Sequence, residues 1–149
     1  MYRDKMNELK KWKNSTTRKP LIIRGARQVG KTWLMKEFGK QCYKKCAYIN
    51  FDDNSRMDKL FEEDFDLDKI IQGLKIESNV NIEPENTLII LDEIQETPKA
   101  LKALKYFYEN ANQYHIVSAG SLLGVAIHEG TSFPVGKVDF LDLAPLSFF

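Results

Sequence analysis

The sequence contains few cysteines and histidines, and this scarcity limits the kinds of site it can hold. Cys42 and Cys46, together with His115 and His128, are all that occur in 149 residues. The histidines lack the close spacing, to each other and to the cysteines, that a zinc module requires. We therefore predict that both cysteines are reduced structural thiols in a reducing compartment.

Long apolar runs and low-complexity segments are also lacking. No stretch is apolar enough to span a bilayer, and residues 1–5 do not begin a signal peptide. Hydrophobic residues make up 43% of the chain and charged residues 29%, which is ordinary for a folded protein. No internal repeat is present. We therefore expect a single cytoplasmic unit with its own hydrophobic core.

The charge is unevenly distributed although the net charge is only +1. Residues 1–45 hold 14 Lys/Arg against 3 Asp/Glu, whereas residues 46–149 hold 8 against 18. A basic segment of this kind binds nucleic acid or an acidic membrane surface in some proteins. A solvated helix face beside a phosphate site explains it as well, and we favour this second interpretation.

Apolar periodicity predicts alternating helices and strands. Met6, Leu9 and Trp12 recur at helical spacing, which predicts a basic amphipathic helix over 1–13 and, with its linker, an N-terminal segment over 1–19. Further helices are predicted over 31–41, 56–76 (two short ones), 97–110 and 121–127, and strands over 21–23, 47–51, 87–91, 115–118 and 138–143. This alternation predicts an α/β core over 20–149, with helices on both sides of a parallel sheet of about five strands.

A glycine-rich loop lies between the first strand and the second helix and matches the phosphate-loop pattern G-x-x-x-x-G-K-[ST]. Glycine lets the backbone wrap around polyphosphate, and the helix N-terminus adds a positive dipole end. We predict that Lys31 contacts the β- and γ-phosphates and that the Thr32 hydroxyl coordinates Mg²⁺. The candidate nucleotide-binding residues are Gly25, Ala26, Arg27, Gln28, Val29, Gly30, Lys31 and Thr32.

Two acidic residues follow the apolar strand over 87–91. Ligands of open α/β sheets bind at the carboxyl ends of the strands, so Asp92 is expected beside the phosphate loop, holding Mg²⁺ directly or through its water. Glu93 is suited to polarising the water that attacks the γ-phosphate, which favours hydrolysis over phosphoryl transfer to another substrate. The alternative is that both acids belong to a solvent-exposed turn.

Ser118-Ala119-Gly120-Ser121 follows the fourth strand, where a hydroxyl could contact the γ-phosphate or the attacking water. Ser121 is the first candidate for this catalytic role and Ser118 the second. Ser121 could equally well cap the helix that follows it.

With these residues in place, the chain resembles the N-terminal domain of a prokaryotic family of AAA+-type ATPases related to the archaeal ATPases. The matching segments are 24–32, 92–95 with Pro98 shortly after, 119–123 and the Pro-Leu-Ser-Phe segment at 145–148. The resemblance implies a P-loop NTPase fold with the strand order usual in AAA+ proteins, ATP and Mg²⁺ as ligands, and the roles given above. It also implies a C-terminal domain of unknown function, so we expect the chain to be a fragment or a truncated product.

One departure from the family affects the expected rate. Relatives often carry Gly-Arg before the last strand, whereas this sequence has Gly136-Lys137, and no arginine follows Arg56. An arginine finger accelerates phosphoryl transfer by about 10³–10⁵. Unless Arg24, Arg27 or a neighbouring subunit supplies that charge, we predict slow ATP turnover. Because a neighbouring subunit is one of these sources, self-association of the chain is left open.

Three functions follow from these observations. The leading hypothesis is a Mg-dependent ATPase whose hydrolysis drives a conformational change in the second domain. The first alternative is a nucleotide-binding regulatory switch with little intrinsic hydrolysis. The second is an ATP-dependent nucleic-acid-binding protein that uses the basic N-terminal third, with Trp12 among its lysines.

Overall fold

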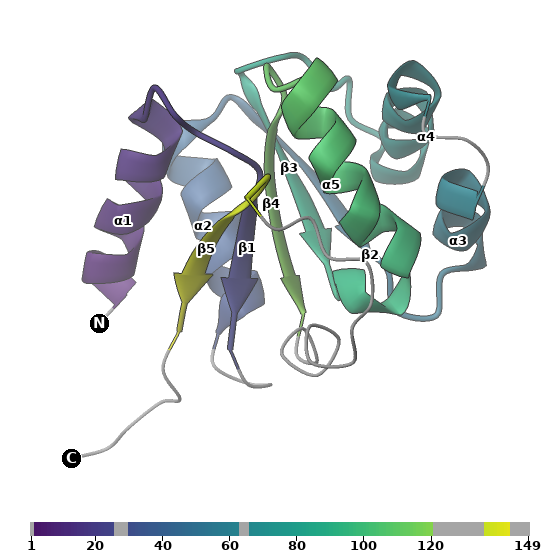
Figure 1. Cartoon of the computed structure of the whole chain (residues 1–149). Helices are drawn as coiled ribbons and strands as arrows, with labels where there is room; N and C mark the ends of the chain where they lie inside the picture. Colours follow the sequence, from purple (N-terminus) through teal and green to yellow (C-terminus); the bar gives the residue numbers. More distant parts are fainter. Residues whose placement is uncertain (1, 26–29, 63–65, 121–135, 144–149) are drawn as a thin grey trace.

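A computed structural model describes residues 2–25, 30–62, 66–120 and 136–143 of the chain (Figure 1). The helices are α1 (Tyr2–Asn14), α2 (Lys31–Cys42), α3 (Ser55–Glu62), α4 (Leu67–Ser78) and α5 (Pro98–Asn110), with a 3-10 turn, η1 (Ile94–Glu96). The strands are β1 (Leu21–Arg24), β2 (Lys45–Asn50), β3 (Thr87–Asp92), β4 (His115–Gly120) and β5 (Asp139–Asp142). The helix expected over 121–127 lies outside the described residues.

The five described strands form one parallel sheet in the order β2-β3-β4-β1-β5. Every residue of the central strands β3 and β4 is buried, which explains why apolar residues run consecutively in the middle of each strand (88–91 and 116–117) instead of alternating with polar ones. The helices lie on both faces of this sheet (Figure 1). The predicted α/β fold with a central parallel sheet is therefore confirmed, and all strands end along the same edge.

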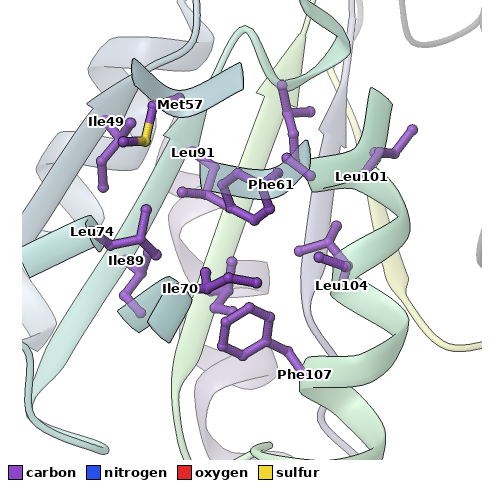
Figure 2. Packing of buried hydrophobic residues seen from close by; sticks show 14 of the residues in the cluster. Ile49, Met57, Phe61, Ile70, Leu74, Ile89, Leu91, Leu101, Leu104 and Phe107 are labelled. Atoms are coloured by element: carbon purple, nitrogen blue, oxygen red, sulfur yellow. The ribbon is translucent and has the colours of Figure 1, made fainter. Parts of the chain in front are cut away.

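Two hydrophobic clusters fill the space between the sheet and its helices. Side chains of α3, α4 and α5 pack on one face, together with Ile89 and Leu91 of β3 (Figure 2). Side chains of α1 and α2 pack on the other face, together with Leu88 and Ile90. Because side chains alternate along a strand, Asp92 shares the face of Leu88 and Ile90 and points to the side covered by α2.

Helix α1 contributes to the second cluster through its apolar side. Met6, Leu9 and Trp12 are buried against the sheet and α2, as the helical spacing predicted. The Trp12 indole is only 7% exposed, and its N–H donates to the carbonyl of Lys19 at 2.7 Å. The hypothesis that Trp12 contacts nucleic acid is therefore wrong, because a buried ring presents no face to a base.

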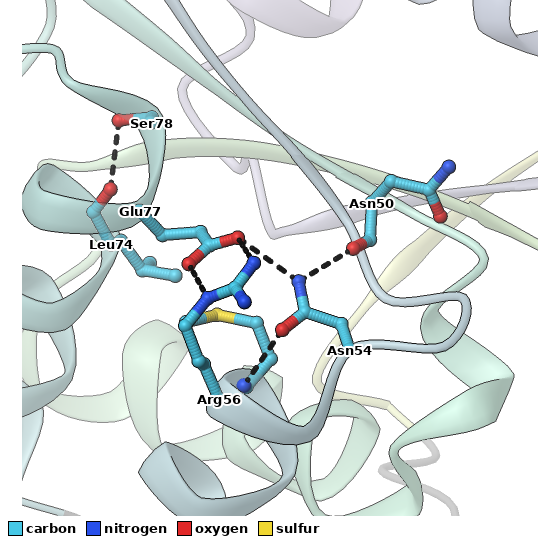
Figure 3. A network of polar contacts seen from close by, with 7 residues as sticks. Asn50, Asn54, Arg56, Leu74, Glu77 and Ser78 are labelled. Atoms are coloured by element: carbon cyan, nitrogen blue, oxygen red, sulfur yellow. Dashed lines mark hydrogen bonds and ion pairs between the residues drawn. The ribbon is translucent and has the colours of Figure 1, made fainter.

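The turn after β2 is fixed by a network of polar contacts (Figure 3). Asn54 accepts from the N–H of Met57 at 3.1 Å and donates to the carbonyl of Asn50 and to the Glu77 carboxylate. Arg56 makes two hydrogen bonds to the same carboxylate, at 2.8 and 2.9 Å, and these bonds lower the pKa of Glu77. The network ties the carboxyl end of β2 to α3 and α4.

The cysteines are half-buried free thiols, and burial raises the pKa of Cys46. Among the described helices, none combines the length and the apolar character that a membrane crossing requires.

Candidate functional site

The segment between β1 and α2 begins at the edge of the sheet where the strands end. Gly30, its last described residue, has φ 84° and ψ 22°, a left-handed conformation that favours glycine. The Gly30 carbonyl accepts from the N–H of Leu34 at 3.0 Å and so begins the helix. The Gly-Lys-Thr sequence therefore puts Lys31 and Thr32 in the first turn of α2. The predicted loop residues Ala26, Arg27, Gln28 and Val29 lie outside the described residues.

The ammonium group of Lys31 is held inside the site. This side chain is 7% exposed, and its Nζ donates to the carbonyl oxygen of Gly25 at 2.8 Å. The contact joins the two ends of the phosphate loop. A lysine is almost never this buried without partners, because removing its charge from water is costly. The fold therefore supplies a positive charge where the sequence motif predicts phosphate.

Asp92 lies at the end of β3 and receives hydrogen bonds from three elements. Its Oδ2 atom accepts from the Thr32 hydroxyl at 2.6 Å and from the Tyr48 hydroxyl at 2.7 Å. Its Oδ1 atom accepts from the N–H of Glu93 at 3.0 Å. Asp92 is 3% exposed, so a solvent-exposed turn does not describe this residue. Thr32 and Asp92 are 60 residues apart in the sequence and in direct contact in the fold.

Glu93 has a backbone conformation that the sequence did not indicate. Its φ of 55° and ψ of 42° are left-handed, which costs a residue other than glycine roughly 1–2 kcal/mol. The chain turns sharply here from β3 into η1. The Glu93 carboxylate is half-buried and accepts from Nε2 of Gln95 at 2.8 Å, while the Oε1 atom of Gln95 is buried without a partner among the described residues. Strained backbone of this kind is frequent at functional positions.

Among the described residues, the remaining candidates make other contacts. Ser118 is buried within β4, and the alternation of side chains places it on the face opposite Asp92. Ser121 lies outside the described residues. Arg24 makes an ion pair with Asp142 at 2.7 Å and stacks on the Phe140 ring at 4.2 Å. The guanidinium groups of Arg24 and Arg56 are thus both engaged by acids in the same chain.

The donor set matches a magnesium-bound nucleotide. Mg²⁺ prefers oxygen ligands and usually binds through one or two carboxylates and the phosphates of a substrate. Thr32 and Asp92 provide such oxygens, with the ammonium of Lys31 in the same helical turn. Within the described part of the chain, no group of three or more His, Cys, Asp or Glu side chains gathers into another metal site.

Sequence reasoning missed Tyr48, which contacts Asp92 directly. Both lie on the α2 side of adjacent strands, since Asn50 pairs with Asp92 and Tyr48 is two residues earlier. Burial, followed by the hydrogen bond to Asp92, raises the pKa of Tyr48, so the phenol remains a hydrogen-bond donor. The contact was not predictable from sequence because no local pattern gives the register between β2 and β3.

Comparisons with known proteins agree with this fold. A family model described as an AAA domain matches residues 17–149. The fold is similar to a Walker-type ATPase of Pyrococcus abyssi, with a TM-score of 0.61 and 16% identity over 99% of this chain and 54% of that one. It is also similar to the ORC1 protein of Aeropyrum pernix, solved in complex with DNA, with a TM-score of 0.56 and 14% identity over 99% of this chain and 44% of that one. No curated protein matches in sequence. The chain spans about half the length of these two solved structures. Its fold is that of a nucleotide-binding ATPase core.

Proposed function

The chain belongs to the AAA domain family, and from this premise we propose that it binds ATP together with Mg²⁺ and hydrolyses the nucleotide. The observation that carries the proposal is the contact of Thr32 with Asp92, at 2.6 Å, beside the buried ammonium of Lys31. In this proposal residues 20–149 form the ATPase core, to which residues 1–19 are attached.

In this proposal Lys31, Thr32 and Asp92 each have a part in nucleotide binding. Lys31 exchanges its bond to the Gly25 carbonyl for bonds to phosphate oxygens, and the N–H groups of the loop add further donors. The Thr32 hydroxyl and the Asp92 carboxylate hold the cation. When bound, Mg²⁺ would neutralise charge on the phosphate oxygens. The Thr32 hydroxyl can keep donating to Asp92 while its own lone pairs face the metal.

Glu93 is the proposed general base. Its carboxylate accepts one hydrogen bond from Gln95 and has further lone pairs to accept from a water molecule. Taking a proton from that water would make it a stronger nucleophile. Ser121 is proposed to contact the γ-phosphate or the water.

Slow turnover by a single chain is part of the proposal. Arg24 and Arg56 are paired with Asp142 and Glu77, which leaves Arg27 or a second copy of the chain to stabilise charge on the phosphate. If a second copy supplies an arginine, the rate per chain should rise with protein concentration. If Arg27 supplies it, that rate stays constant.

The central experiment measures ATP binding with and without Mg²⁺ and phosphate release on the same samples. Glu93→Gln should keep its ATP affinity and lose about two to four powers of ten in phosphate release. Equal phosphate release by the native chain and this variant would instead support the regulatory switch, in which ATP binding alone is the signal. Absence of ATP binding by the native chain would reject both functions.

The contacts of Glu93 and of the two arginines favour the switch as the second candidate function. As described, the base is bonded to Gln95 and the two arginines are paired, an arrangement that suits nucleotide binding without rapid hydrolysis. In either case we propose that the nucleotide state is transmitted to a further domain.

A nucleic-acid-binding function is kept as an alternative because exposed cations lie along α1 and α2. Arg3, Lys10 and Trp33 line a hollow of about 260 Å³ between these helices, and Trp33 is 54% exposed. The ORC1 structure, which has a similar fold, contains DNA. Charge reversal at Lys10 and Lys11 should then weaken salt-dependent DNA binding. Lys13 is a poorer target because its ammonium bonds to the Cys42 carbonyl.

A further inference from the structure

A tyrosine of the neighbouring strand holds the Asp92 carboxylate together with Thr32. The hydroxyl groups of Tyr48 and Thr32 donate to the same oxygen, Oδ2, at 2.7 and 2.6 Å. Tyr48 pairs with Ile90 in the sheet, so its side chain reaches Asp92 diagonally across the two strands. The contact therefore depends on the pairing of β2 with β3 and not on the phosphate loop.

The hydrogen bonds at Asp92 leave a defined position open. A deprotonated carboxylate accepts about four hydrogen bonds, two on each oxygen. Thr32 and Tyr48 occupy the two positions on Oδ2, and the N–H of Glu93 occupies one on Oδ1. The fourth position, on Oδ1, is left for a cation or a water bound to it. Without Tyr48, Thr32 alone would hold Oδ2, and the carboxylate would be held less firmly against rotation about its terminal bond.

The Tyr48 ring is itself held in place from α2. The Nζ atom of Lys36 lies 4.0 Å from the centre of the ring, close enough for a cation–π contact. Lys36 is one turn beyond Thr32 in the same helix. The phenol is thus fixed between the helix that begins at the phosphate loop and the strand that ends in Asp92.

We propose that Tyr48 is a positioning residue for magnesium, because it sets which oxygen of Asp92 faces the cation in the Mg-ATP complex. This inference rests on the proposed function and adds a residue outside the two sequence motifs. Asp92 contacts the cation, and Tyr48 acts through Asp92.

The test compares two variants that each remove one hydrogen-bonded tyrosine hydroxyl. Tyr48→Phe removes the bond to Asp92, whereas Tyr43→Phe removes the 2.6 Å contact with His115 at the opposite edge of the sheet. For each protein, the ATP dissociation constant is measured with and without Mg²⁺. The constant without Mg²⁺ divided by the constant with Mg²⁺ gives the factor by which the metal strengthens ATP binding. Tyr48→Phe should reduce this ratio about tenfold, as expected for one lost hydrogen bond to a charged group, and leave metal-free ATP affinity unchanged. Tyr43→Phe should leave the ratio at the native value.

The outcomes separate this inference from the function on which it rests. Native protein that binds no ATP, or binds it equally well with and without Mg²⁺, would reject the proposed function and this inference with it. A clear metal effect in the native chain with the same ratio in Tyr48→Phe would reject the role of Tyr48 alone.

A second measurement covers the case in which Tyr48→Phe does not fold. The full chain with 3-fluorotyrosine at position 48 keeps the hydroxyl and reports on it by ¹⁹F NMR. The resonance should shift when Mg²⁺ is added to the ATP-bound protein. An unchanged resonance under saturating Mg²⁺ would overturn the proposal.

Discussion

Tyr48 and Tyr43 pack on the same face of the sheet, but their hydroxyl groups meet very different partners. Tyr48 donates to Asp92 where the strands end, and Tyr43 is 2.6 Å from Nδ1 of His115 where β4 begins. The two contacts are of similar length, and the first is partly buried whereas the second is buried. The surroundings of each contact, rather than the contact itself, separate a functional edge from a structural one.

The amino-terminal edge is closed by aromatic rings. His115 packs edge-to-face with Trp12 and Tyr43, with ring centres 6.0 and 5.4 Å apart, and Phe38 packs against the same two residues. At the carboxyl edge, counting only the described residues, one acceptor position on Asp92 and the Oε1 atom of Gln95 are without a partner, and Glu93 is left-handed. The paired hydroxyl of Tyr43 and imidazole of His115 contribute stability at the first edge, and the open acceptor position beside Asp92 suits a ligand at the second.

The largest expected effect is a loss of ATP affinity when the lysine at the carboxyl edge of the sheet is replaced. Lys31→Met keeps the apolar stem of the side chain and removes its charge, so ATP affinity should fall by about 10²–10³, or roughly 3–4 kcal/mol. Lys40→Met, in the last turn of the same helix, is the matched control and should bind like the native chain. Calorimetric titration measures both. Equal affinities for the three proteins would contradict the assignment of Lys31.

The second prediction concerns pH and the closed edge. Burial, with Arg18 and Lys13 nearby, lowers the pKa of His115 from 6.5 to about 4 in the folded chain. The unfolded chain therefore binds this proton first, and the free energy of unfolding should fall as the pH drops from 6.5 towards 4, by at most about 1.4 kcal/mol per pH unit.

Urea unfolding between pH 4 and 8 measures this dependence, and His115→Asn supplies the control. The variant retains His128 and every carboxylate, so only the contribution of His115 is removed. Its stability should change less steeply below pH 6.5 than that of the native chain. Parallel curves would show that His115 is not held neutral.

The third prediction uses the two tyrosines against each other. Tyr43→Phe leaves Nδ1 of His115 without its partner and should lower the free energy of unfolding by about 1 kcal/mol, while ATP affinity with Mg²⁺ stays native. Denaturant unfolding and nucleotide titration on the same preparations measure the two quantities. A loss of ATP affinity in Tyr43→Phe would mean that the two edges are coupled.

The smallest expected effect is a change in the free energy of unfolding that tests the backbone conformation at Glu93. Glu93→Gly removes the side chain from a left-handed position and should raise the free energy of unfolding by up to about 1 kcal/mol while abolishing phosphate release. Glu85, with φ 71°, is the matched position in a turn away from the site. The Glu85→Gly variant should show a similar rise in the free energy of unfolding and should retain phosphate release. If only Glu85→Gly is stabilised, the Glu93 side chain itself stabilises the fold.

Much of the fold was predictable from local patterns. Apolar periodicity predicted the described α-helices and strands with bounds that differ from the structure by up to two residues, as for β2, which begins at Lys45 instead of Ala47, and β4, which ends at Gly120 instead of Ser118. The phosphate loop and the acidic strand end were recognisable because each depends on a few adjacent residues. The 3-10 turn and the left-handed Glu93 were not predicted, since their conformations are imposed by packing after β3. The functional assignments of the site residues, Lys31, Thr32, Asp92 and Glu93 as well as Arg27 and Ser121, remain predictions.

The sequence by itself determined the alternation of helices and strands, the glycine-rich turn and the acids at the end of a buried strand, because these follow from spacing along the chain. Only the tertiary structure decided the register of β2 beside β3 and the sharing of one oxygen of Asp92 by Thr32 and Tyr48. Strand order and side-chain contacts arise from packing residues that are far apart in the sequence, and no local pattern specifies which of them meet.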